Sequence, residues 1–177
     1  VLLDFGSPRC SPCLFIKNKI FTIDSIADFI NERFVSVDYT EGPEKKRLSK
    51  IYEVYTEPVL LICDANGKVM HRMEGKCTAG EMMARLRQSL DVKNNLTAQK
   101  LMYDNGNRSS EFLINYLETL HIAGLRTQRD SVLHNIFSLS FHVDSLKTPK
   151  YWNVFLRYNE SPVSQEGSYV FKHREEF

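Results

Sequence analysis

The sequence lacks the features that mark membrane-spanning chains and nucleic-acid-binding proteins. No hydrophobic run approaches the length of a membrane span. The 23 basic and 22 acidic residues leave a formal net charge of only +1. Such a balance gives no electrostatic basis for binding nucleic acid or an anionic membrane surface. We therefore expect no membrane span and no nucleic-acid partner.

The motifs of several enzyme and cofactor classes are missing as well. The sequence holds no nucleophile elbow, no phosphate-binding loop and no dinucleotide fingerprint, so we expect no cofactor. The five histidines, at positions 71, 121, 134, 142 and 173, do not have metal-ligand spacing. What is present is a chain of 177 residues with 42% hydrophobic content, enough for one large or two small domains.

Two of the four cysteines lie in residues 1–17, VLLDFGSPRCSPCLFIK. The first five residues predict a buried strand, and Cys10-Ser11-Pro12-Cys13 predicts the first turn of a helix after a short loop. Unpaired backbone N–H groups and the positive end of the helix dipole favour a thiolate there. We therefore predict that Cys10, at the cap, is the nucleophile. Cys13, one turn further on, is placed to attack a mixed disulfide formed by Cys10.

Two other interpretations of this pair stay open. Cysteines spaced i and i+3 form half of many zinc sites, although Cys63 and Cys77 do not supply a second close pair. A structural disulfide is the other alternative, but a bridge that closes so short a loop removes little entropy from the unfolded chain. We expect no metal site. Cys63, at the end of a predicted central strand, is expected to be a buried, inert thiol.

Further features of residues 1–91 resemble the thioredoxin family. Asp4 stands six residues before the first cysteine, where the family keeps a buried acid, and Tyr52–Pro58 (YEVYTEP) matches the family's segment ending in a cis-proline. The spacing of the following strands, turn and helix agrees with the family. The resemblance implies an α/β class, thioredoxin-like fold, in which a mixed central sheet is flanked by helices.

The resemblance also implies roles for individual residues. Burial beneath the cysteine pair raises the pKa of a carboxyl group, which would suit Asp4 to exchange a proton with Cys13. Pro58 is expected to be cis beside Cys10, and the backbone of the preceding residue to pair with an extended substrate strand. The expected catalytic residues are Cys10, Cys13 and Asp4, and the expected substrate-binding residues are Pro58, Glu57, Arg9 and Pro12.

Apolar periodicity predicts the other elements of residues 1–91. The expected order is a helix from Ser11 to Ile20, a second helical piece capped by Asp24, a strand over residues 34–39, a helix starting at Gly42-Pro43-Glu44, a strand at Val59–Ile62, a turn at Asn66-Gly67, a strand to Met73, and a last helix capped by Thr78 that carries Met82, Met83, Leu86 and Leu90. The charge run Glu44–Arg47 is expected to be a solvated helix face.

Residues 92–177 predict a separate α-helical region of helical hairpins. Apolar positions recur at helical spacing between polar breaks, and short loops imply antiparallel neighbours. The expected helices contain Leu96 to Tyr103, Ser110 to Leu120, Val132 to Phe141, Pro149 to Leu156, and a last stretch from Ser164. Similar helical tails follow thioredoxin-like domains in some envelope proteins of Gram-negative bacteria.

The favoured function is a thiol–disulfide oxidoreductase that acts on protein disulfides or dithiols and is served by an unidentified electron donor. The alternative is a binding module that holds a partner through its helical region. Two departures from the family support that alternative: Arg9 replaces the usual tryptophan, and Glu57 replaces the usual apolar or threonine residue. A thiol peroxidase is a third class, but its characteristic active-site sequence is missing.

The resemblance implies the periplasm or cell envelope as the compartment. No signal peptide is visible, and the chain opens directly on a predicted buried strand, so we expect residues upstream of Val1. In an oxidising envelope, a reactive cysteine pair must be kept reduced by a dedicated donor.

Overall fold

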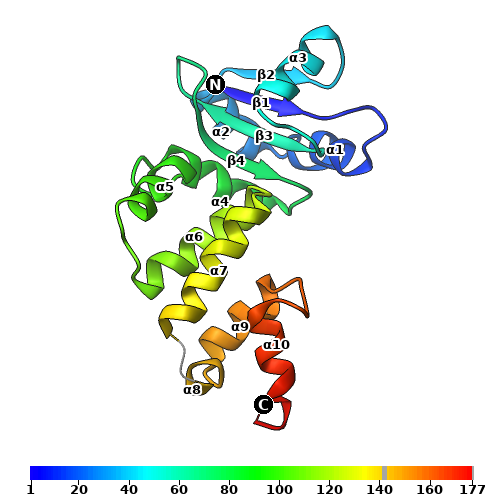
Figure 1. Ribbon diagram of the computed structural model, residues 1–177. Coiled ribbons are helices and arrows are strands. Elements are labelled where there is room, and N and C mark those ends of the chain that lie inside the picture. Colours follow the sequence, from blue (N-terminus) through cyan, green and yellow to red (C-terminus); the bar gives the residue numbers. More distant parts are fainter. Residues whose placement is uncertain (141–142, 177) are drawn as a thin grey trace. The chain divides into compact units, whose positions relative to one another are not determined.

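The computed structural model describes residues 1–140 and 143–176, and Figure 1 traces the chain from the N-terminus to the C-terminus. The chain forms two compact units. The first comprises Val1–Asn105 with Ile122–Gly124, and the second comprises Gly106–His121 with Leu125–Phe177. Three residues named in the sequence analysis, Phe141, His142 and Phe177, lie outside the described residues.

The first unit is built on a four-stranded sheet with the strand order β2–β1–β3–β4. The strands are β1 (Leu2–Phe5), β2 (Ser36–Tyr39), β3 (Val59–Cys63) and β4 (Val69–Glu74). β1 is parallel to β2 and antiparallel to β3, and β4 is antiparallel to β3. The predicted mixed sheet is therefore confirmed, and β1, which leads toward the cysteine pair, is one of its two central strands.

Both faces of this sheet are buried. Successive side chains along a strand point to opposite faces, so a single strand can contribute to both cores. Leu60 and Ile62 of β3 belong to one core, whereas Val59, Leu61 and Cys63 belong to the other. Each fully buried aliphatic side chain contributes roughly 1.5–3 kcal/mol through the hydrophobic effect. A strand that is apolar at every position thus predicts helices on both faces.

The helices supply the outer halves of both cores. The elements that carry the first core are α1 (Ser11–Phe15), the π-helical turn η1 (Ile16–Ile20), α2 (Asp24–Arg33) and α4 (Ala79–Leu90). The second core is closed by Leu48 of α3 (Pro43–Ile51) and by Tyr52, the residue after it. The helices flanking the sheet are therefore confirmed.

The helices α4 and α3 start where the sequence predicted, and in each case a residue at the helix start explains why. Thr78 accepts a hydrogen bond from the backbone N–H of Glu81, and its own N–H donates to the Glu81 carboxylate at 2.7 Å, a capping box. Pro43 opens α3 directly after Gly42, which has a φ of +99°, a conformation that favours glycine.

Several boundaries differ from the expected ones. The helix from Ser11 does not continue as an α-helix to Ile20 but changes at Ile16 to a π-helical turn. The expected cap at Asp24 is wrong by one residue, since Ile23 is the cap and Asp24 begins the helix. An acid in the first turn still interacts favourably with the helix dipole. β2 begins at Ser36, and Phe34 instead packs into the first core.

The first unit continues past Asp91, where the sequence composition changes. It includes α5 (Leu96–Asp104), which is capped by Asn95 and lies against β4. The backbone N–H of Leu96 donates to Nδ1 of His71 at 3.1 Å. Thr97 Oγ1 donates to the carbonyl of Val69 at 2.9 Å. Both contacts join the start of α5 to β4.

The described residues of the second unit form helices joined by loops, without a strand among them, as expected. Its helices are α6 (Ser110–Ile122), α7 (Arg126–Ser140), α8 (Val143–Leu146), α9 (Pro149–Tyr158) and α10 (Gln165–Lys172), with a 3₁₀ turn at Arg174–Glu176. The short helix α8 was not predicted. Among the described residues of the chain, no helix is both long enough and apolar enough to cross a membrane.

Candidate active site

Cys10 and Cys13 form a disulfide at the start of α1, with their Cα atoms 5.2 Å apart. Cys10 is the N-cap residue, and its sulfur accepts a hydrogen bond from the backbone N–H of Cys13 at 3.1 Å. Pro12 lies in the first turn, where a missing N–H costs no helical hydrogen bond. The predicted position of Cys10 is thus confirmed, and after reduction its sulfur would keep a backbone donor that favours the thiolate.

Gly6 permits the close approach of the preceding loop to this disulfide. A Cβ atom at Gly6 would lie 3.2 Å from Cys13 Cβ and 3.4 Å from its sulfur. The first of these distances is tighter than ordinary van der Waals contact. A glycine directly after β1 was a visible signal for this packing, but the sequence alone did not say what it would contact.

The peptide bond between Glu57 and Pro58 is cis, as the resemblance implied. Pro58 is buried, and β3 starts at the next residue. A carboxylate oxygen of Glu57 and the sulfur atoms of Cys10 and Cys13 all lie within 4.8 Å of one another. Glu57 is therefore directly beside the disulfide, although the sequence separates them widely.

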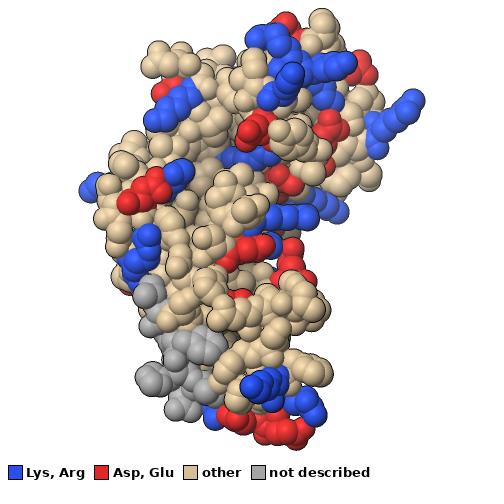
Figure 2. All heavy atoms as spheres, in the orientation of Figure 1, with Lys and Arg blue, Asp and Glu red and all other residues tan. Residues whose placement is uncertain are grey.

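Lys45 is a site residue that the sequence analysis missed. Its ammonium group lies 2.6 Å from Glu57 Oε1, and it donates to the carbonyl oxygens of Gly6 at 2.5 Å and Thr40 at 3.3 Å. Figure 2 shows Lys and Arg side chains gathered over α3, with acidic side chains among them. Placing Lys45 on a solvated face was wrong, because only 20% of its side chain is exposed.

These contacts set the charge of Glu57. Partial burial by itself raises the pKa of this carboxyl group, but hydrogen bonds from Lys45 and Ser7 outweigh that effect and hold the pKa below its ordinary value. Glu57 is thus an ionised carboxylate next to the disulfide. Its charge opposes a Cys10 thiolate, and the Lys45 charge compensates for it.

Arg9 and Pro12 are exposed around the disulfide. Among the ion pairs of the described residues, the partner of Glu57 is Lys45 and not Arg9. The two departures from the family pattern, Arg9 and Glu57, are therefore not paired with each other, and the charge of Glu57 is compensated by Lys45. Arg9 remains a positive charge immediately before Cys10.

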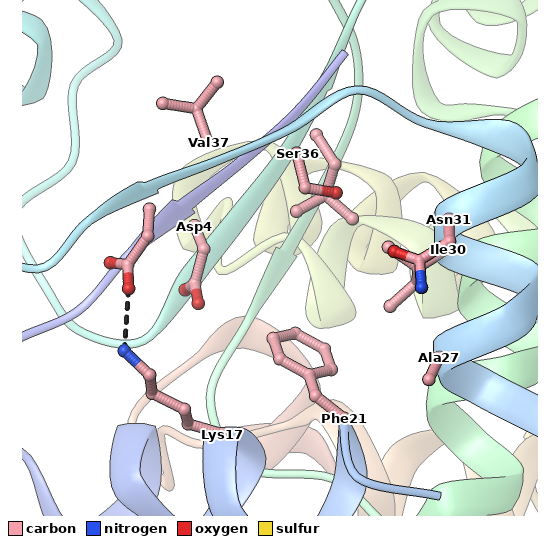
Figure 3. Close-up of a pocket in the computed structure, with 10 residues that line it drawn as sticks. Asp4, Lys17, Phe21, Ala27, Ile30, Asn31, Ser36 and Val37 are labelled. Atoms are coloured by element: carbon pink, nitrogen blue, oxygen red, sulfur yellow. Dashed lines mark hydrogen bonds and ion pairs between the residues drawn. The ribbon is translucent and has the colours of Figure 1, made fainter. Parts of the chain in front are cut away.

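Asp4 lines a cavity of about 300 Å³ beside β1 and β2. Figure 3 shows its carboxylate pointing into the same space as Lys17 and Phe21. Burial raises the pKa of Asp4 to about 6; Asp38 adds to the rise, and Lys17 opposes it. The expected buried acid with a raised pKa is confirmed.

The same cavity gives Asp4 a connection to solvent. Lys17 and Asp38 form an ion pair of 2.8 Å, and their side chains are 55% and 46% exposed. Lys17 lies four residues after Cys13, one helical turn along the same segment. Asp4 therefore shares its cavity with a residue of the segment that follows the cysteine pair and with exposed polar groups.

The other two cysteines have a different environment. Cys63 and Cys77 are free and buried, and burial raises the pKa of each thiol. Cys63 lies in β3, and Cys77 belongs to the opposite core from Cys63. The predicted burial of Cys63 is confirmed, and the two thiols do not form the second half of a zinc site.

The fold and this site define a class, the thioredoxin-like domains. A family model described as a thioredoxin-like domain matches residues 1–90, half of the chain. The chain therefore belongs to the thioredoxin-like family, as the resemblance predicted.

Similar solved structures align with about half of the chain. A thioredoxin-fold protein from Helicobacter pylori is 23% identical, with 52% of this chain and 70% of that chain covered and a TM-score of 0.46. A putative disulphide-isomerase from Bacteroides thetaiotaomicron is 28% identical, with coverages of 51% and 75% and a TM-score of 0.45. The reduced C-terminal domain of DsbD from Neisseria meningitidis is 23% identical, with coverages of 50% and 79% and a TM-score of 0.43. Comparison with curated proteins gives no match.

Proposed function

We propose that this protein is a thiol–disulfide oxidoreductase that reduces or exchanges disulfides in protein substrates. The observation that carries the proposal is the Cys10–Cys13 disulfide at a helix start, in a domain of the thioredoxin-like family. A partly exposed cysteine pair of this kind can gain and lose two electrons without a cofactor. The buried, separated Cys63 and Cys77 are not suited to this chemistry.

The reaction begins with the reduced pair. The Cys10 thiolate attacks one sulfur of a substrate disulfide, the substrate S–S bond breaks, and the departing thiolate takes up a proton. Cys13, once deprotonated, then attacks the Cys10 sulfur of the mixed disulfide and releases the second substrate thiolate, which is protonated in turn. The substrate gains two electrons and two protons, and the Cys10–Cys13 disulfide forms. An unidentified dithiol donor restores the reduced pair.

Asp4 is the proposed proton acceptor for Cys13. Its pKa of about 6 places its titration close to neutral pH, where a general base works well. The cavity shared with the exposed Lys17–Asp38 pair supports proton exchange with solvent. Asp4 acts on the second step, because Cys13 must lose its proton before it attacks.

Substrate binding is proposed for Pro58, Glu57, Arg9 and Pro12. Pro58 directly follows Glu57, whose carboxylate lies within 4.8 Å of both sulfur atoms. Arg9 and Pro12 are exposed next to Cys10. A substrate segment that delivers its disulfide to Cys10 would therefore contact a cis-proline loop on one side and a cationic loop on the other.

A binding module with little redox activity is the second candidate. The Glu57 carboxylate beside the disulfide supports it, because a neighbouring negative charge disfavours a thiolate. Lys45, 2.6 Å from that carboxylate, supports the oxidoreductase instead, since it compensates for the charge. The two candidates differ in whether the cysteine pair turns over.

The test is reduction of insulin disulfides with dithiothreitol as donor, followed by the turbidity of the released chains. The protein should accelerate reduction well above the rate with dithiothreitol alone. Cys10→Ser should abolish the acceleration, whereas Cys63→Ser, a buried thiol in the same unit, should keep it. Binding without acceleration would favour the module, and consumption of peroxide by the reduced protein would reveal a thiol peroxidase.

We place this activity in the periplasm or cell envelope, following the family resemblance. An oxidising compartment would require a donor that keeps Cys10 and Cys13 reduced against oxidation. Rapid thiol trapping in intact cells, combined with cell fractionation, tests both points. Recovery in the cytoplasmic fraction would contradict the proposed compartment.

A further inference from the structure

Three metal-ligating side chains meet at the candidate active site from two distant parts of the chain. The sulfur atoms of Cys10 and Cys13 and a carboxylate oxygen of Glu57 lie within 4.8 Å of one another. We propose that the reduced protein binds Zn²⁺ through these three side chains. The inference rests on the proposed function only in needing the reduced pair, which chemical reduction also supplies.

The chemistry of the three ligands fits zinc. Thiolates select soft or borderline ions, and zinc accepts a mixture of sulfur and carboxylate ligands. Three protein ligands leave the fourth tetrahedral position open to water. The pair alone is half of a common zinc site, and the structure supplies a third ligand that no local sequence spacing reveals.

The geometry needs only small movements. Zinc–sulfur bonds of about 2.3 Å and zinc–oxygen bonds of about 2.0–2.2 Å put the tetrahedral sulfur and oxygen ligands roughly 3.5–3.8 Å apart. Reduction breaks the bond between the two sulfurs and lets them separate toward that distance. The Glu57 oxygen lies within 4.8 Å of both sulfurs, so it must approach by at most about 1.3 Å, within the range of a side-chain adjustment.

The charges around the site also balance. Two thiolates and one carboxylate carry three negative charges, and a zinc ion neutralises two of them. Lys45, 2.6 Å from Glu57 Oε1, neutralises the third. A carboxylate has two oxygens with about four acceptor positions, so it can hold the ammonium group and the ion together. The partly exposed Glu57, 28% accessible, does not have to be desolvated completely.

Zinc binding and disulfide exchange exclude each other. The ion occupies the sulfur lone pairs that attack a substrate, and its binding releases the protons of any thiols still protonated. When a substrate disulfide takes two electrons from the metal-free pair and is reduced to two thiols, the Cys10–Cys13 disulfide that forms has no thiolate left to bind the ion. The same residues thus couple the occupancy of a metal site to the redox state of the pair.

The test is a zinc titration in competition with a chromophoric chelator. The whole protein is reduced with a phosphine, which does not leave a competing dithiol, and is desalted without oxygen. The reduced protein should bind one Zn²⁺ and the oxidised protein none at this site. Since Cys63 and Cys77 stay free in both forms, the oxidised protein measures any binding by those thiols.

Glu57→Gln decides the role of the third ligand. It should weaken binding by at least about tenfold, since loss of even an outer-shell partner commonly costs 10–100-fold in affinity. Glu41→Gln, an exposed acid in the loop before α3, is the matched control and should bind as the parent does. The Co²⁺-loaded reduced protein should show the thiolate charge-transfer bands and strong visible absorption of a four-coordinate site.

Equal zinc affinity of Glu57→Gln and the parent would overturn the proposed site. So would equal zinc binding by the oxidised and reduced protein, or the failure of the reduced protein to bind zinc. The insulin assay separates this result from the proposed function. A protein that reduces insulin but does not bind Zn²⁺ refutes the metal site alone. One that binds Zn²⁺ without turnover refutes the oxidoreductase alone.

Discussion

Asp4, which is partly buried, and His71, which is fully buried, are titratable side chains in two different regions of the first unit. Asp4 lies in the central strand β1, and His71 lies in the edge strand β4. Loss of hydration shifts each group toward its neutral form. Burial raises the pKa of Asp4 to about 6, and burial, followed by the nearby Arg85, lowers the pKa of His71 to about 4.

Asp4 and His71 differ in the surroundings of their side chains. Asp4 faces a cavity whose exposed Lys17–Asp38 pair connects it to solvent. His71 has no exposed surface, and its Nδ1 accepts the N–H of Leu96 at the start of α5. A shifted pKa therefore identifies a candidate proton carrier only where protons can reach the group. Burial would thus suit Asp4 to the proposed proton transfer, whereas it leaves His71 as a hydrogen-bond acceptor for the start of α5.

The largest expected contrast is between the two environments of cysteine. In the reduced protein, iodoacetamide at pH 7 should modify Cys10 at least about 100-fold faster than Cys63 or Cys77. A helix start and a neighbouring backbone donor are expected to hold the pKa of the reduced Cys10 below that of a free thiol, whereas burial raises the pKa of the other two. Mass spectrometry of tryptic peptides after short labelling times measures the order.

The urea-unfolded protein is the control, because all four cysteines should then react at similar rates. Preferential labelling of Cys63 or Cys77 in the folded protein would contradict the assignment of Cys10 as the nucleophile.

The next prediction concerns Asp4→Asn. Resolution of the mixed disulfide near pH 7 should slow by about tenfold or more, because general acid–base catalysis typically contributes at least that much. The dependence of the rate on pH between about 5 and 7 should also flatten. Stopped-flow measurement of the second step with a fluorescent disulfide peptide checks both expectations.

The stability of Asp4→Asn should rise, although its rate of mixed-disulfide resolution should fall. Because the folded pKa of Asp4 lies above its unfolded value of 3.8, the folded protein holds the proton more tightly, and stability falls as pH rises from about 4 to about 6. Asp4→Asn removes this loss and should be more stable at pH 7 by about 1–3 kcal/mol, with no gain below pH 4. An unstable variant with an unchanged rate would rule out the proton role.

His71→Phe should have the complementary result. The folded pKa of His71 lies below its unfolded value of 6.5, so the parent should lose stability as pH falls from about 6.5 to about 4. The variant removes this dependence, and it loses about 1 kcal/mol at pH 7 because the Leu96 N–H has no acceptor. Urea unfolding across pH measures both effects. The insulin rate at pH 7 should match the parent, and a slower rate would place His71 in the reaction.

Local sequence patterns were sufficient for most of the fold and half of the site. The apolar run of β3, the Thr78 cap and the proline at the start of α3 act through neighbours within a few residues. The cap position of Cys10 could be predicted for the same reason, since a helix start acts on the residue at its cap, and its role as nucleophile stays a prediction. Asp4 and Pro58 required the family resemblance.

Contacts between distant segments could not be predicted in this way. Whether Lys45 points to solvent or to Glu57 depends on how α3 packs beside the cis-proline loop, and charge periodicity is the same in either case. The change at Asp91 marked a difference in composition, but α5 still joins the first unit through His71 and Thr97. One turn of π-helix after Phe15 likewise has no simple sequence signal.

The smallest expected effect concerns substrate charge. Arg9→Glu should lower kcat/KM for acidic disulfide peptides and raise it for basic ones, by about two- to fivefold, because exposed charges are worth only a few tenths to 1 kcal/mol. Glu57→Lys should act in the opposite sense but more weakly, because Lys45 already compensates for Glu57 whereas Arg9 is exposed. Matched peptides that differ only in flanking charges, measured at low and high salt, test this difference, and salt should reduce both effects. Equal responses of the two peptide classes would exclude Arg9 and Glu57 from recognition, and a larger effect at Glu57 would show that Lys45 does not compensate for it during turnover.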